Sequence, residues 1–354
     1  MQMSDDRNMN ENHRKSHLPL EDWADYRESV RAELELVIDR TLPPLRGIMR
    51  YHMGWENEQG DAGQPRPGKF VRAILHMLSC GAVGGDAAQT IPAAAALELI
   101  HNFSLIHDDI QDGSHERRGR PTVWALWGTS QAINVGDFLF ALASLALLRL
   151  GDHNVPGEDI VHSFQLLAEA CKDLCEGQYL DLEFEKRVDI TLEDYLGMVR
   201  RKTAALIAAS TSMGAHLGGG GERVSHFHRF GEALGIAYQI SDDILGIWGV
   251  KKTTGKSVEA DLRQRKKTLP VVYALRESKD RATLAGIYSA NEIKGSDIPV
   301  ALEILDRSGA REYAQGLVEG YCHQALVQLE ASGVGADRSA PLVRIAQFLR
   351  EREY

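Results

Sequence analysis

The sequence predicts an all-α protein built as a single domain. Alanine and leucine recur at helical spacing in four stretches, residues 93–106, 138–150, 161–182 and 202–217. No stretch shows the sustained alternation of β-branched residues that is typical of strands. No Pro/Gly/Ser-rich linker divides the middle of the 354 residues, although the length alone would suit one large domain or two ordinary ones. We therefore expect one helical domain.

Local signals mark the ends of several elements. Residues 1–17 are polar and lack periodicity, so we expect a disordered tail followed by a folded domain over residues 18–354. The segment Thr191–Asp194 has the form of a capping box, which predicts that a helix begins there. The glycine-rich segment from Gly218 to Gly221 should end one helix before the next begins.

The composition narrows the classes of function. A formal net charge of −10 argues against nonspecific binding to nucleic acid. The N-terminal residues lack the apolar core of a secretory signal, and the most apolar run, Phe138–Leu150, is too short to span a bilayer. The four cysteines form no disulfide or metal-ligand pattern, and Cys171 and Cys175 are expected to be packing residues. We expect a cytoplasmic protein without a transmembrane segment.

The most informative motif is a group of three aspartates at the end of an apolar helical run. Asp108 and Asp112 are four residues apart, so their carboxylates should project from the same face of a helix. Two carboxylates on an apolar wall repel each other and are costly to desolvate unless a cation lies between them. Magnesium suits such a site because it usually binds one or two carboxylates together with substrate phosphates. The alternative is a solvated acidic turn at a helix end.

A second apolar run ends in the paired aspartates Asp242 and Asp243. Two such runs suggest two acidic walls that face each other across a cavity, with metal ions between them. Basic residues near both motifs would bind a polyanion bridged by those metals, and diphosphate is the simplest such polyanion. These basic residues are Lys69, Arg72, Arg117, Arg118, Lys202, Lys256 and Lys266.

With these motifs the chain resembles the trans-isoprenyl diphosphate synthases of the polyprenyl synthetase family, and most of all those that make geranylgeranyl diphosphate. The second motif departs from the family pattern, because Gly246 stands where many members have a third aspartate. Phe70 and Ala73 replace an arginine and a proline that are often present in the first basic element. The matching elements occur in the family's order and are Gly68–Arg72, His101, Asp108–Asp112 with Arg117–Arg118, Lys202–Thr203, Gln239–Asp243, and Lys256 with Lys266.

The resemblance implies a helical bundle of the isoprenoid synthase type with a deep central cavity, and a polyprenyl synthetase catalytic domain over residues 18–354. It also implies the reaction. An allylic diphosphate (dimethylallyl, geranyl or farnesyl) ionises with the help of Mg²⁺ and couples to isopentenyl diphosphate. The same resemblance leads us to expect a homodimer.

Expected roles at the allylic site follow from the matched positions. The expected ligands of three Mg²⁺ ions are Asp108, Asp112 and Asp242. Lysines would neutralise the charge that develops on the departing diphosphate, and an arginine would support it from the side of the first motif. These residues are Lys202, Lys256, Lys266 and Arg117.

Isopentenyl diphosphate would need a second, metal-free pocket, which the resemblance assigns to Lys69, Arg72, His101 and Arg118. Proximity of its alkene to the carbocation would then permit carbon–carbon bond formation. The segment that carries Lys256 and Lys266 would serve as a lid, although it can also be interpreted as a solvated loop, and we expect Lys267 to be a surface charge. Oxygen dipoles near the carbocation would come from Thr203 and Gln239.

Product length is predicted from residues just before the first aspartate motif, which form the cavity floor in this family. Phe103 precedes Asp108 by five residues, or about 7–8 Å along a helix, and Ser104 precedes it by four. One bulky ring at the fifth position, a small residue at the fourth and no insertion inside the motif resemble the pattern of synthases that make geranylgeranyl diphosphate. Alternatively, Phe103 simply packs against a neighbouring helix, and the products are farnesyl or longer-chain diphosphates.

Two other classes of function fit parts of this pattern. A terpene cyclase also ionises an allylic diphosphate with magnesium, but it needs no pocket for isopentenyl diphosphate. The four residues matched to that pocket argue against a cyclase, although Gly246 departs from the synthase pattern. A noncatalytic partner subunit would keep the fold and lose the metal ligands, and the complete first motif argues against it.

Overall fold

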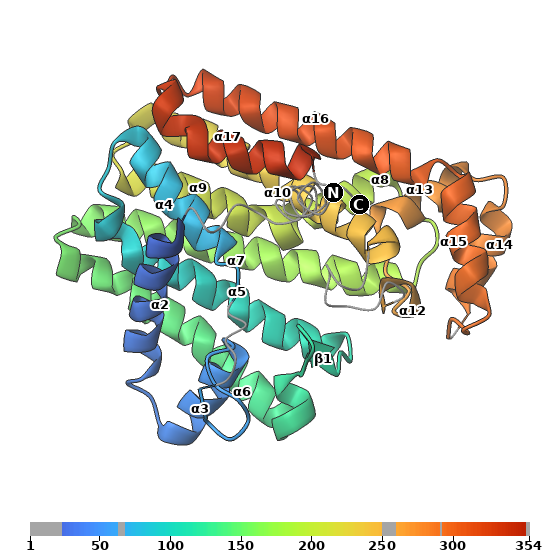
Figure 1. Cartoon of the computed structure of the whole chain (residues 1–354), viewed down its shortest axis with the longest axis horizontal. Coiled ribbons are helices and arrows are strands. Elements are labelled where there is room, and N and C mark those ends of the chain that lie inside the picture. Colours follow the sequence, from blue (N-terminus) through green and yellow to red (C-terminus); the bar gives the residue numbers. More distant parts are fainter. Residues whose placement is uncertain (1–22, 63–67, 250–259, 291, 352–354) are drawn as a thin grey trace, which may run out of the picture.

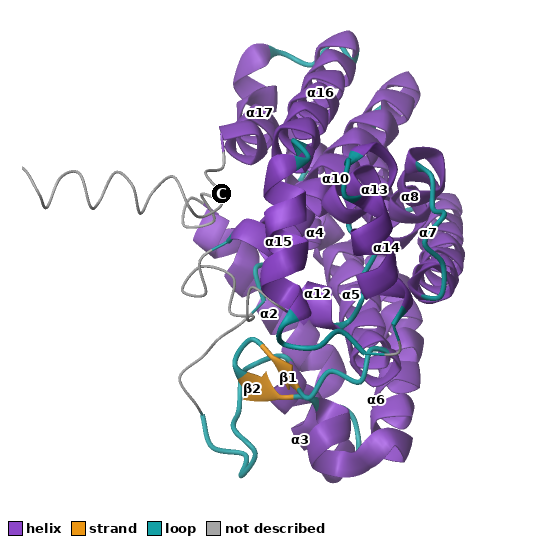
Figure 2. Cartoon of the chain, turned by 90° about the vertical axis from the view of Figure 1, so that its right-hand side faces the viewer, coloured by secondary structure: helices purple, strands orange, loops and turns teal. Residues whose placement is uncertain are grey.

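The computed structural model describes residues 23–62, 68–249, 260–290 and 292–351, and it confirms the all-α prediction. The predicted tail at residues 1–17 and the predicted diphosphate ligand Lys256 lie outside the described residues. Nearly all of the regular structure is helical, as Figure 2 shows.

All four stretches that the sequence predicted are helical, with residues 149–150 in a 3₁₀ turn and residues 202–204 in a π-turn. In chain order the α-helices are α2 (Ala24–Ile38), α3 (Pro43–His52), α4 (Val71–Val83), α5 (Ile91–Gln111), α6 (Val123–Leu148), α7 (Gly157–Glu185), α8 (Leu192–Val199), α9 (Ala205–Leu217), α10 (Val224–Trp248), α12 (Ala260–Arg263), α13 (Leu269–Glu277), α14 (Arg281–Ser289), α15 (Asp297–Arg307), α16 (Ala310–Ala331) and α17 (Ala336–Glu351). Short 3₁₀ turns are η2 (Ala87–Thr90), η3 (Arg149–His153) and η5 (Gly221–Arg223), and η4 (Arg200–Ala204) is a π-turn.

The long helices α5, α7, α9 and α10 occupy the middle of the molecule, and α16 and α17 cover one side (Figure 1). α5 packs along α6, α4 along α9, and α10 between α9 and α16. Most buried apolar side chains belong to one large cluster that includes these helices. A smaller cluster joins α13, α14 and α15 at the far end of the bundle. The central helices therefore supply the rigid walls on which any site must be built.

Both predicted helix-end signals are confirmed. Thr191 accepts a hydrogen bond from the backbone N–H of Asp194, and Asp194 accepts one from the backbone N–H of Thr191, which completes the capping box of α8. α9 ends at Leu217, immediately before the glycine segment, and α10 begins at Val224.

The most apolar helix is longer than the apolar run that the sequence analysis identified. Residues 138–150 are only part of α6, which begins at Val123 and bends at Gly128, where φ is +80°. Together with η3, this helix is the one stretch of the described residues whose length and hydropathy would suffice to cross a membrane, and 44% of its most apolar window is buried in the protein. It packs along α5 as part of the large core cluster.

A small hairpin that the sequence analysis did not predict lies beside the first aspartate motif. β1 (Glu116–Arg117) pairs antiparallel with β2 (Arg120–Pro121) (Figure 2). The two turn residues, Arg118 and Gly119, have φ values of +55° and +71°, as a type I′ hairpin turn requires. Glycine adopts this conformation readily, whereas arginine does so at a cost. The hairpin places Arg117 and Arg118 close to the end of α5.

The π-turn η4 contains Lys202 and Thr203, two residues of the predicted site. Such turns are rare and occur often at functional sites. Gly177 of α7 packs directly on this turn, since a Cβ atom at Gly177 would overlap the backbone of Lys202. The close approach of α7 to the π-turn therefore requires glycine at this position.

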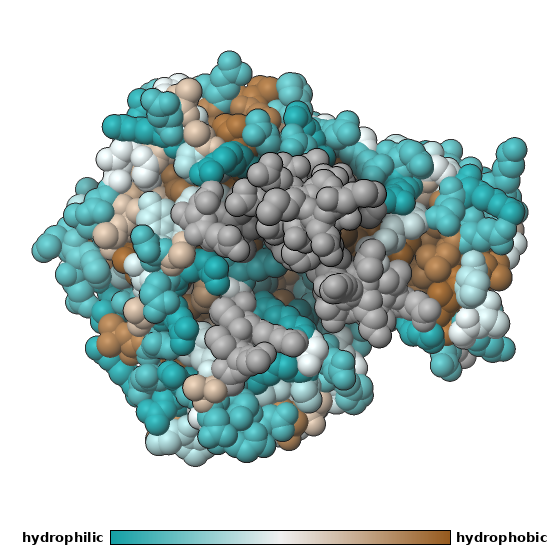
Figure 3. All heavy atoms as spheres, in the orientation of Figure 1, coloured by the Kyte–Doolittle hydropathy of each residue, from teal (hydrophilic) through white to brown (hydrophobic). Residues whose placement is uncertain are grey.

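The face of the molecule seen in Figure 3 is mainly hydrophilic, which agrees with the charged content of the chain. Apolar side chains on this face form small groups, and one of them lies over α14 and α15.

Candidate active site

A cavity of about 500 Å³ lies between α4, α5, α7, the π-turn and α10, with the hairpin at one side. It brings together residues that are up to 170 positions apart in the chain, from Arg72 to Asp242. The predicted deep cavity is thus present. Its lining includes eleven of the predicted site residues, namely Arg72, His101, Phe103, Ser104, Asp108, Arg117, Arg118, Lys202, Thr203, Gln239 and Asp242.

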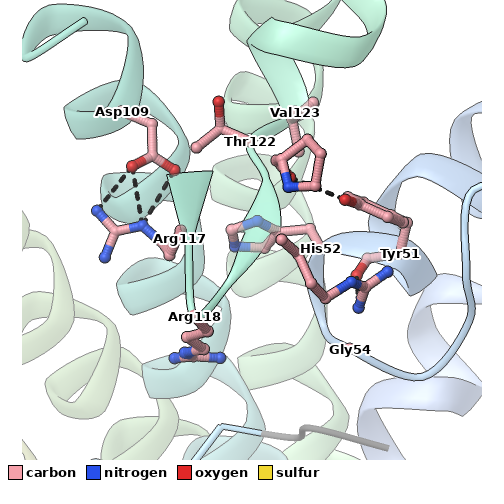
Figure 4. A pocket seen from close by; sticks show the side chains of 10 residues that line it. Tyr51, His52, Gly54, Asp109, Arg117, Arg118, Thr122 and Val123 are labelled. Atoms are coloured by element: carbon pink, nitrogen blue, oxygen red, sulfur yellow. Dashed lines mark hydrogen bonds and ion pairs between the residues drawn. The ribbon is translucent and has the colours of Figure 1, made fainter. Parts of the chain in front are cut away.

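The aspartates of the first motif have different surroundings. Asp108 lines the cavity, and Asp112 follows one turn later at the C-cap of α5. Asp109 is 3% exposed and turns away, where both of its oxygens accept hydrogen bonds from Nε of Arg117 at 2.9 and 3.0 Å (Figure 4). The motif therefore places Asp108 at the cavity, Asp112 at the end of the helix and Asp109 where it anchors the hairpin.

Lys202 lies between carboxylates of two helices. Its Nζ donates to Oδ2 of Asp181 at 2.6 Å and lies 3.4 Å from Oδ1 of Asp108. Burial alone would raise the pKa of Asp108, but the charges of Lys202, Lys266 and Arg117 outweigh it and lower that pKa. Burial would likewise lower the pKa of Lys202, and Asp108 and Asp181 raise it instead. Asp108 and Lys202 therefore stay charged at neutral pH.

Lys266 reaches the same group of carboxylates from the segment before α13. Its Nζ donates to Oδ2 of Asp112 at 2.7 Å. The other oxygen of Asp112, Oδ1, is buried and has no hydrogen-bond partner among the described residues. A buried acceptor without a donor is costly, so this atom marks a place where a cation would be stabilised.

The acidic groups suit magnesium better than a metal that needs a complete protein cage. No three His, Cys, Asp or Glu side chains converge closely enough to hold a metal by themselves in the part of the chain that the structure describes. Magnesium needs fewer protein ligands because it takes its remaining oxygens from water and from substrate phosphates. Asp108 and Asp242 on facing walls, with the unpartnered oxygen of Asp112, offer the hard oxygen donors that this chemistry requires.

The two aspartates of the second motif also have different surroundings. Asp242 lines the cavity, whereas Asp243 is buried below it. Asp243 accepts hydrogen bonds from the hydroxyl of Tyr195 at 2.6 Å, from the backbone N–H of Leu269 at 2.8 Å and from the side chain of Gln239 at 2.9 Å. The Gln239 amide oxygen in turn accepts the hydroxyl of Thr203 at 2.7 Å. Asp243 thus orients the cavity-lining pair Thr203 and Gln239.

A basic cluster occupies the side of the cavity next to the hairpin. Arg72 and Arg118 line it with His101, and the buried Nε–H of Arg72 has no hydrogen-bond partner among the described residues. Burial, followed by the charges of Arg72 and Arg118, holds the pKa of His101 well below its usual value. His101 is therefore a neutral hydrogen-bonding group rather than a third cation at neutral pH. The predicted Lys69 is exposed on the loop before α4 and does not line the cavity.

The two predicted chain-length residues, Phe103 and Ser104, both line the cavity. Phe103 is largely buried, and its ring makes edge contacts with Phe140 of α6 and with His107, each at a centroid distance of 5.5 Å. Ser104 also lines the cavity and donates its hydroxyl to the carbonyl of His101 at 2.8 Å. Phe103 therefore packs against a neighbouring helix and forms part of the cavity wall at the same time.

Some residues at the site were not found by sequence reasoning. Asp181 pairs with Lys202, and its only local signal was its place near Gly177 on the long helix α7. Gln178, also on α7, donates to Gln111 across the cavity at 2.8 Å. His52 lies behind the hairpin in Figure 4, in a small pocket beside Arg117 and Arg118. These residues come from helices that approach the motifs only in the folded chain.

The expectation that Lys267 is a surface charge is wrong. The residue is 2% exposed, and its Nζ donates to the carbonyls of Glu185 and Arg265, both at 3.2 Å, while it lies over the ring of Tyr288. Burial lowers the pKa of Lys267 to about 8. Lys267 thereby ties the segment that carries Lys266 to the C-terminus of α7.

The fold and the cavity define the class of this protein. A helical bundle whose central cavity carries acidic groups on facing walls and a basic cluster is suited to bind diphosphates. Residues 57–305 match the polyprenyl synthetase family model, and the chain belongs to that family of prenyltransferases.

Relatives and solved structures agree with this assignment. A geranylgeranyl diphosphate synthase of Mycobacterium tuberculosis is 38% identical over 92% of this chain and 93% of its own length. A (2E,6E)-farnesyl diphosphate synthase of Mycobacterium bovis is 34% identical over 92% of this chain and 91% of its own. The crystal structure of a polyprenyl synthetase from Streptomyces coelicolor superposes with a TM-score of 0.85 at 36% identity, covering 92% of this chain and 97% of that one.

The buried amine of Lys267 predicts a measurable dependence of stability on pH. Its pKa of about 8 in the folded protein lies below the usual lysine value of about 10.4. Between these values the unfolded chain binds more protons, so the free energy of unfolding should rise with pH. Relative to Lys267→Met, the wild type should gain roughly 2 kcal/mol between pH 7 and pH 10 in urea unfolding. Replacing the exposed Lys172 by methionine is the control, and an equal shift for both variants would contradict the assignment.

Proposed function

We propose that this protein condenses an allylic diphosphate with isopentenyl diphosphate and that its main product is geranylgeranyl diphosphate. One observation carries the proposal. A single cavity is lined by Asp108 of α5 and Asp242 of α10 and also by the cluster of Arg72, His101 and Arg118. Two diphosphates, one to be released and one to be retained, need two such binding regions.

The acidic side suits the ionisation step. Asp108, Asp112 and Asp242 would hold Mg²⁺, by resemblance three ions, and bound Mg²⁺ neutralises charge on a diphosphate leaving group. Lys202 and Lys266 add positive charge from the protein on the same side. The allylic carbon–oxygen bond breaks, and its electron pair leaves with the diphosphate. Preorganised charges of this kind stabilise the developing anion without rearranging during the reaction.

The remaining residues would guide the coupling. Thr203 and Gln239 are hydrogen-bonded to each other and line the cavity, so their oxygen dipoles can stabilise the allylic cation. Arg72 and Arg118, with Lys69 at the entrance, would retain isopentenyl diphosphate and bring its alkene to the cation. The new carbon–carbon bond takes the alkene electrons, and the proton lost afterwards goes to the released diphosphate. Arg117, held by Asp109, would support the allylic diphosphate beside the first motif.

The basic cluster distinguishes this function from cyclisation of an allylic diphosphate. A cyclase binds one diphosphate and has no use for a second group of cations. In this cavity Arg72 is part-buried and Arg118 is more exposed beside His101, and loss of solvent around them lowers the pKa of both guanidinium groups. Retaining such a costly cluster supports a second anionic substrate.

We further propose that the protein is a cytoplasmic homodimer whose residues 18–354 form one catalytic domain. Exposed apolar side chains on one face of α6, together with others on one face of the adjacent α7, support the dimer. Exposed apolar side chains at helical spacing on two neighbouring helices suit a second copy of the chain, although one of them, Tyr179, also lines the cavity. Its residues are Ile133, Phe140 and Leu148 on α6 and Val161, Phe164 and Tyr179 on α7.

Activity should depend strictly on magnesium and should fail when either acidic wall is changed. Asp108→Ala or Asp242→Ala removes an oxygen donor where charge develops, which should cost several kcal/mol and lower turnover on the order of a thousandfold. The assay supplies farnesyl diphosphate and labelled isopentenyl diphosphate at saturating magnesium. Asp189→Ala, which changes an exposed aspartate, is the control. Near-normal turnover in either cavity variant would refute the metal-site assignment.

Phe103→Ala should lengthen the products. Removing the ring deepens the lower part of the cavity, so chain growth should continue beyond the twenty-carbon product of the wild type. Mass spectrometry of the products measures this shift. Phe348→Ala on α17, away from the cavity, should leave the distribution unchanged. A wild type that stops at fifteen carbons, or an unchanged distribution in Phe103→Ala, would show that another residue sets the floor.

The apolar face of α6 and α7 should hold two chains together. Val161 is 70% exposed, and a buried unpaired carboxylate at this position would be costly in a dimer. Analytical ultracentrifugation should therefore show a dimer for the wild type and a monomer for Val161→Glu. Val300→Glu changes an exposed valine on α15 and should remain dimeric. A monomeric wild type, or dissociation by both variants, would contradict the proposed interface.

A further inference from the structure

Glu98 is a buried carboxylate in the apolar half of α5. All the remaining residues from Ala93 to Ile100 are alanine, leucine or isoleucine. Glu98 is 3% exposed and precedes His101 by about one helical turn. Burial raises the pKa of Glu98, and the charges of Arg72 and Arg118 act against that rise. A carboxylate is rarely buried unless it is paired or hydrogen-bonded. Its neighbours show what it stabilises.

The carboxylate of Glu98 lies at the N-terminus of α4. Its Oε1 accepts a hydrogen bond from the backbone N–H of Ala73 at 3.1 Å, and the backbone N–H of Arg72 also stabilises the charged form. The N-cap residue of α4 is Phe70, which has a left-handed φ of +51° and provides no side-chain cap. The first amides of a helix need an acceptor and favour a negative charge. Glu98 supplies both from a different helix.

The helix turn that Glu98 caps is the turn that carries Arg72. The loop before it, at Gly68, packs against the guanidinium group of Arg118, which lies 3.5 Å from the position that a Cβ atom would take. Glu98 is thus close enough to the two arginines of the basic cluster for their charges to stabilise its carboxylate, while His101 of the same helix lines the cavity. The buried negative charge of Glu98 offsets part of the repulsion between the part-buried Arg72 and the more exposed Arg118.

We propose that Glu98 is a positioning residue for the isopentenyl diphosphate pocket, where it caps α4 and holds Arg72 and Arg118 in place. This inference rests on the proposed function. Because Glu98 lies beneath the cluster and does not line the cavity, it acts through the two arginines rather than by touching substrate. The Nε–H of Arg72, buried without a partner among the described residues, stays available for the diphosphate.

Glu98→Gln tests the proposal because it keeps the size of the side chain and removes its charge. The KM for isopentenyl diphosphate should rise about tenfold or more, because the neutral amide accepts the helix N–H more weakly than the carboxylate and no longer offsets the charge of Arg72. The KM for farnesyl diphosphate and kcat at saturating isopentenyl diphosphate should stay within about threefold, since the allylic side is unchanged. A merely structural role would instead change both KM values and kcat together.

Glu33→Gln is the matched control. Glu33 is also a buried carboxylate, paired with Arg149 at 2.6 Å on α2, away from the cavity. It should destabilise the protein without separating the two KM values. If Glu98→Gln does not fold, as judged by circular dichroism, Glu98→Asp replaces it in the same KM measurements. This variant keeps the charge, but its side chain is too short to reach α4. A selective rise in the KM for isopentenyl diphosphate supports the proposal, and equal changes overturn it.

The wild type assayed in parallel separates this inference from the proposed function. A wild type that does not condense the two diphosphates would overturn both. An active wild type with unchanged kinetics in Glu98→Gln would overturn only the role of Glu98.

Discussion

The site depends on keeping charged groups stable inside a bundle of apolar helices. Lys202 does this by pairing with Asp108 of α5 and Asp181 of α7, and Lys266 does it by pairing with Asp112. Removing one member of such a group would leave an uncompensated buried charge, at a cost of about 3–5 kcal/mol. The ion pairs between these cations and carboxylates therefore have two roles. They suit diphosphate chemistry, and they also hold the helices around the cavity together.

Irregular backbone concentrates around the cavity, while the helices that support it are regular. The π-turn presents Lys202 and Thr203, and the left-handed residues Phe70 and Arg118 begin α4 and turn the hairpin. Such conformations cost of order 1–3 kcal/mol each and persist where the surroundings enforce them. Packing of Gly177 on the π-turn and capping of α4 from α5 are two such enforcing contacts. The rigid bundle thus stabilises local geometry that the segments would not adopt alone.

Each aspartate pair shows how neighbouring residues of one type acquire different tasks. Asp108 and Asp242 line the cavity, whereas Asp109 and Asp243 are buried and orient other groups. Adjacent residues on a helix point about 100° apart, so one carboxylate faces the cavity only if its neighbour faces the bundle. The buried members then find donors in Arg117 and in Tyr195. This arrangement explains why a paired motif can serve binding and support at once.

Local pattern by itself determined the helices and the capping box at Thr191, because helical periodicity and short-range hydrogen bonds act within a few residues. The resemblance to the polyprenyl synthetase family, carried by the ordered motifs, identified eleven residues of the cavity lining. Only the tertiary structure decided that Lys267 is buried and that Asp181 and Glu98 support the site, since each depends on a partner in a distant segment. Nothing within a few residues of these side chains distinguishes a buried, paired charge from a solvated one. Their roles follow from which helices meet, and long-range packing decides that.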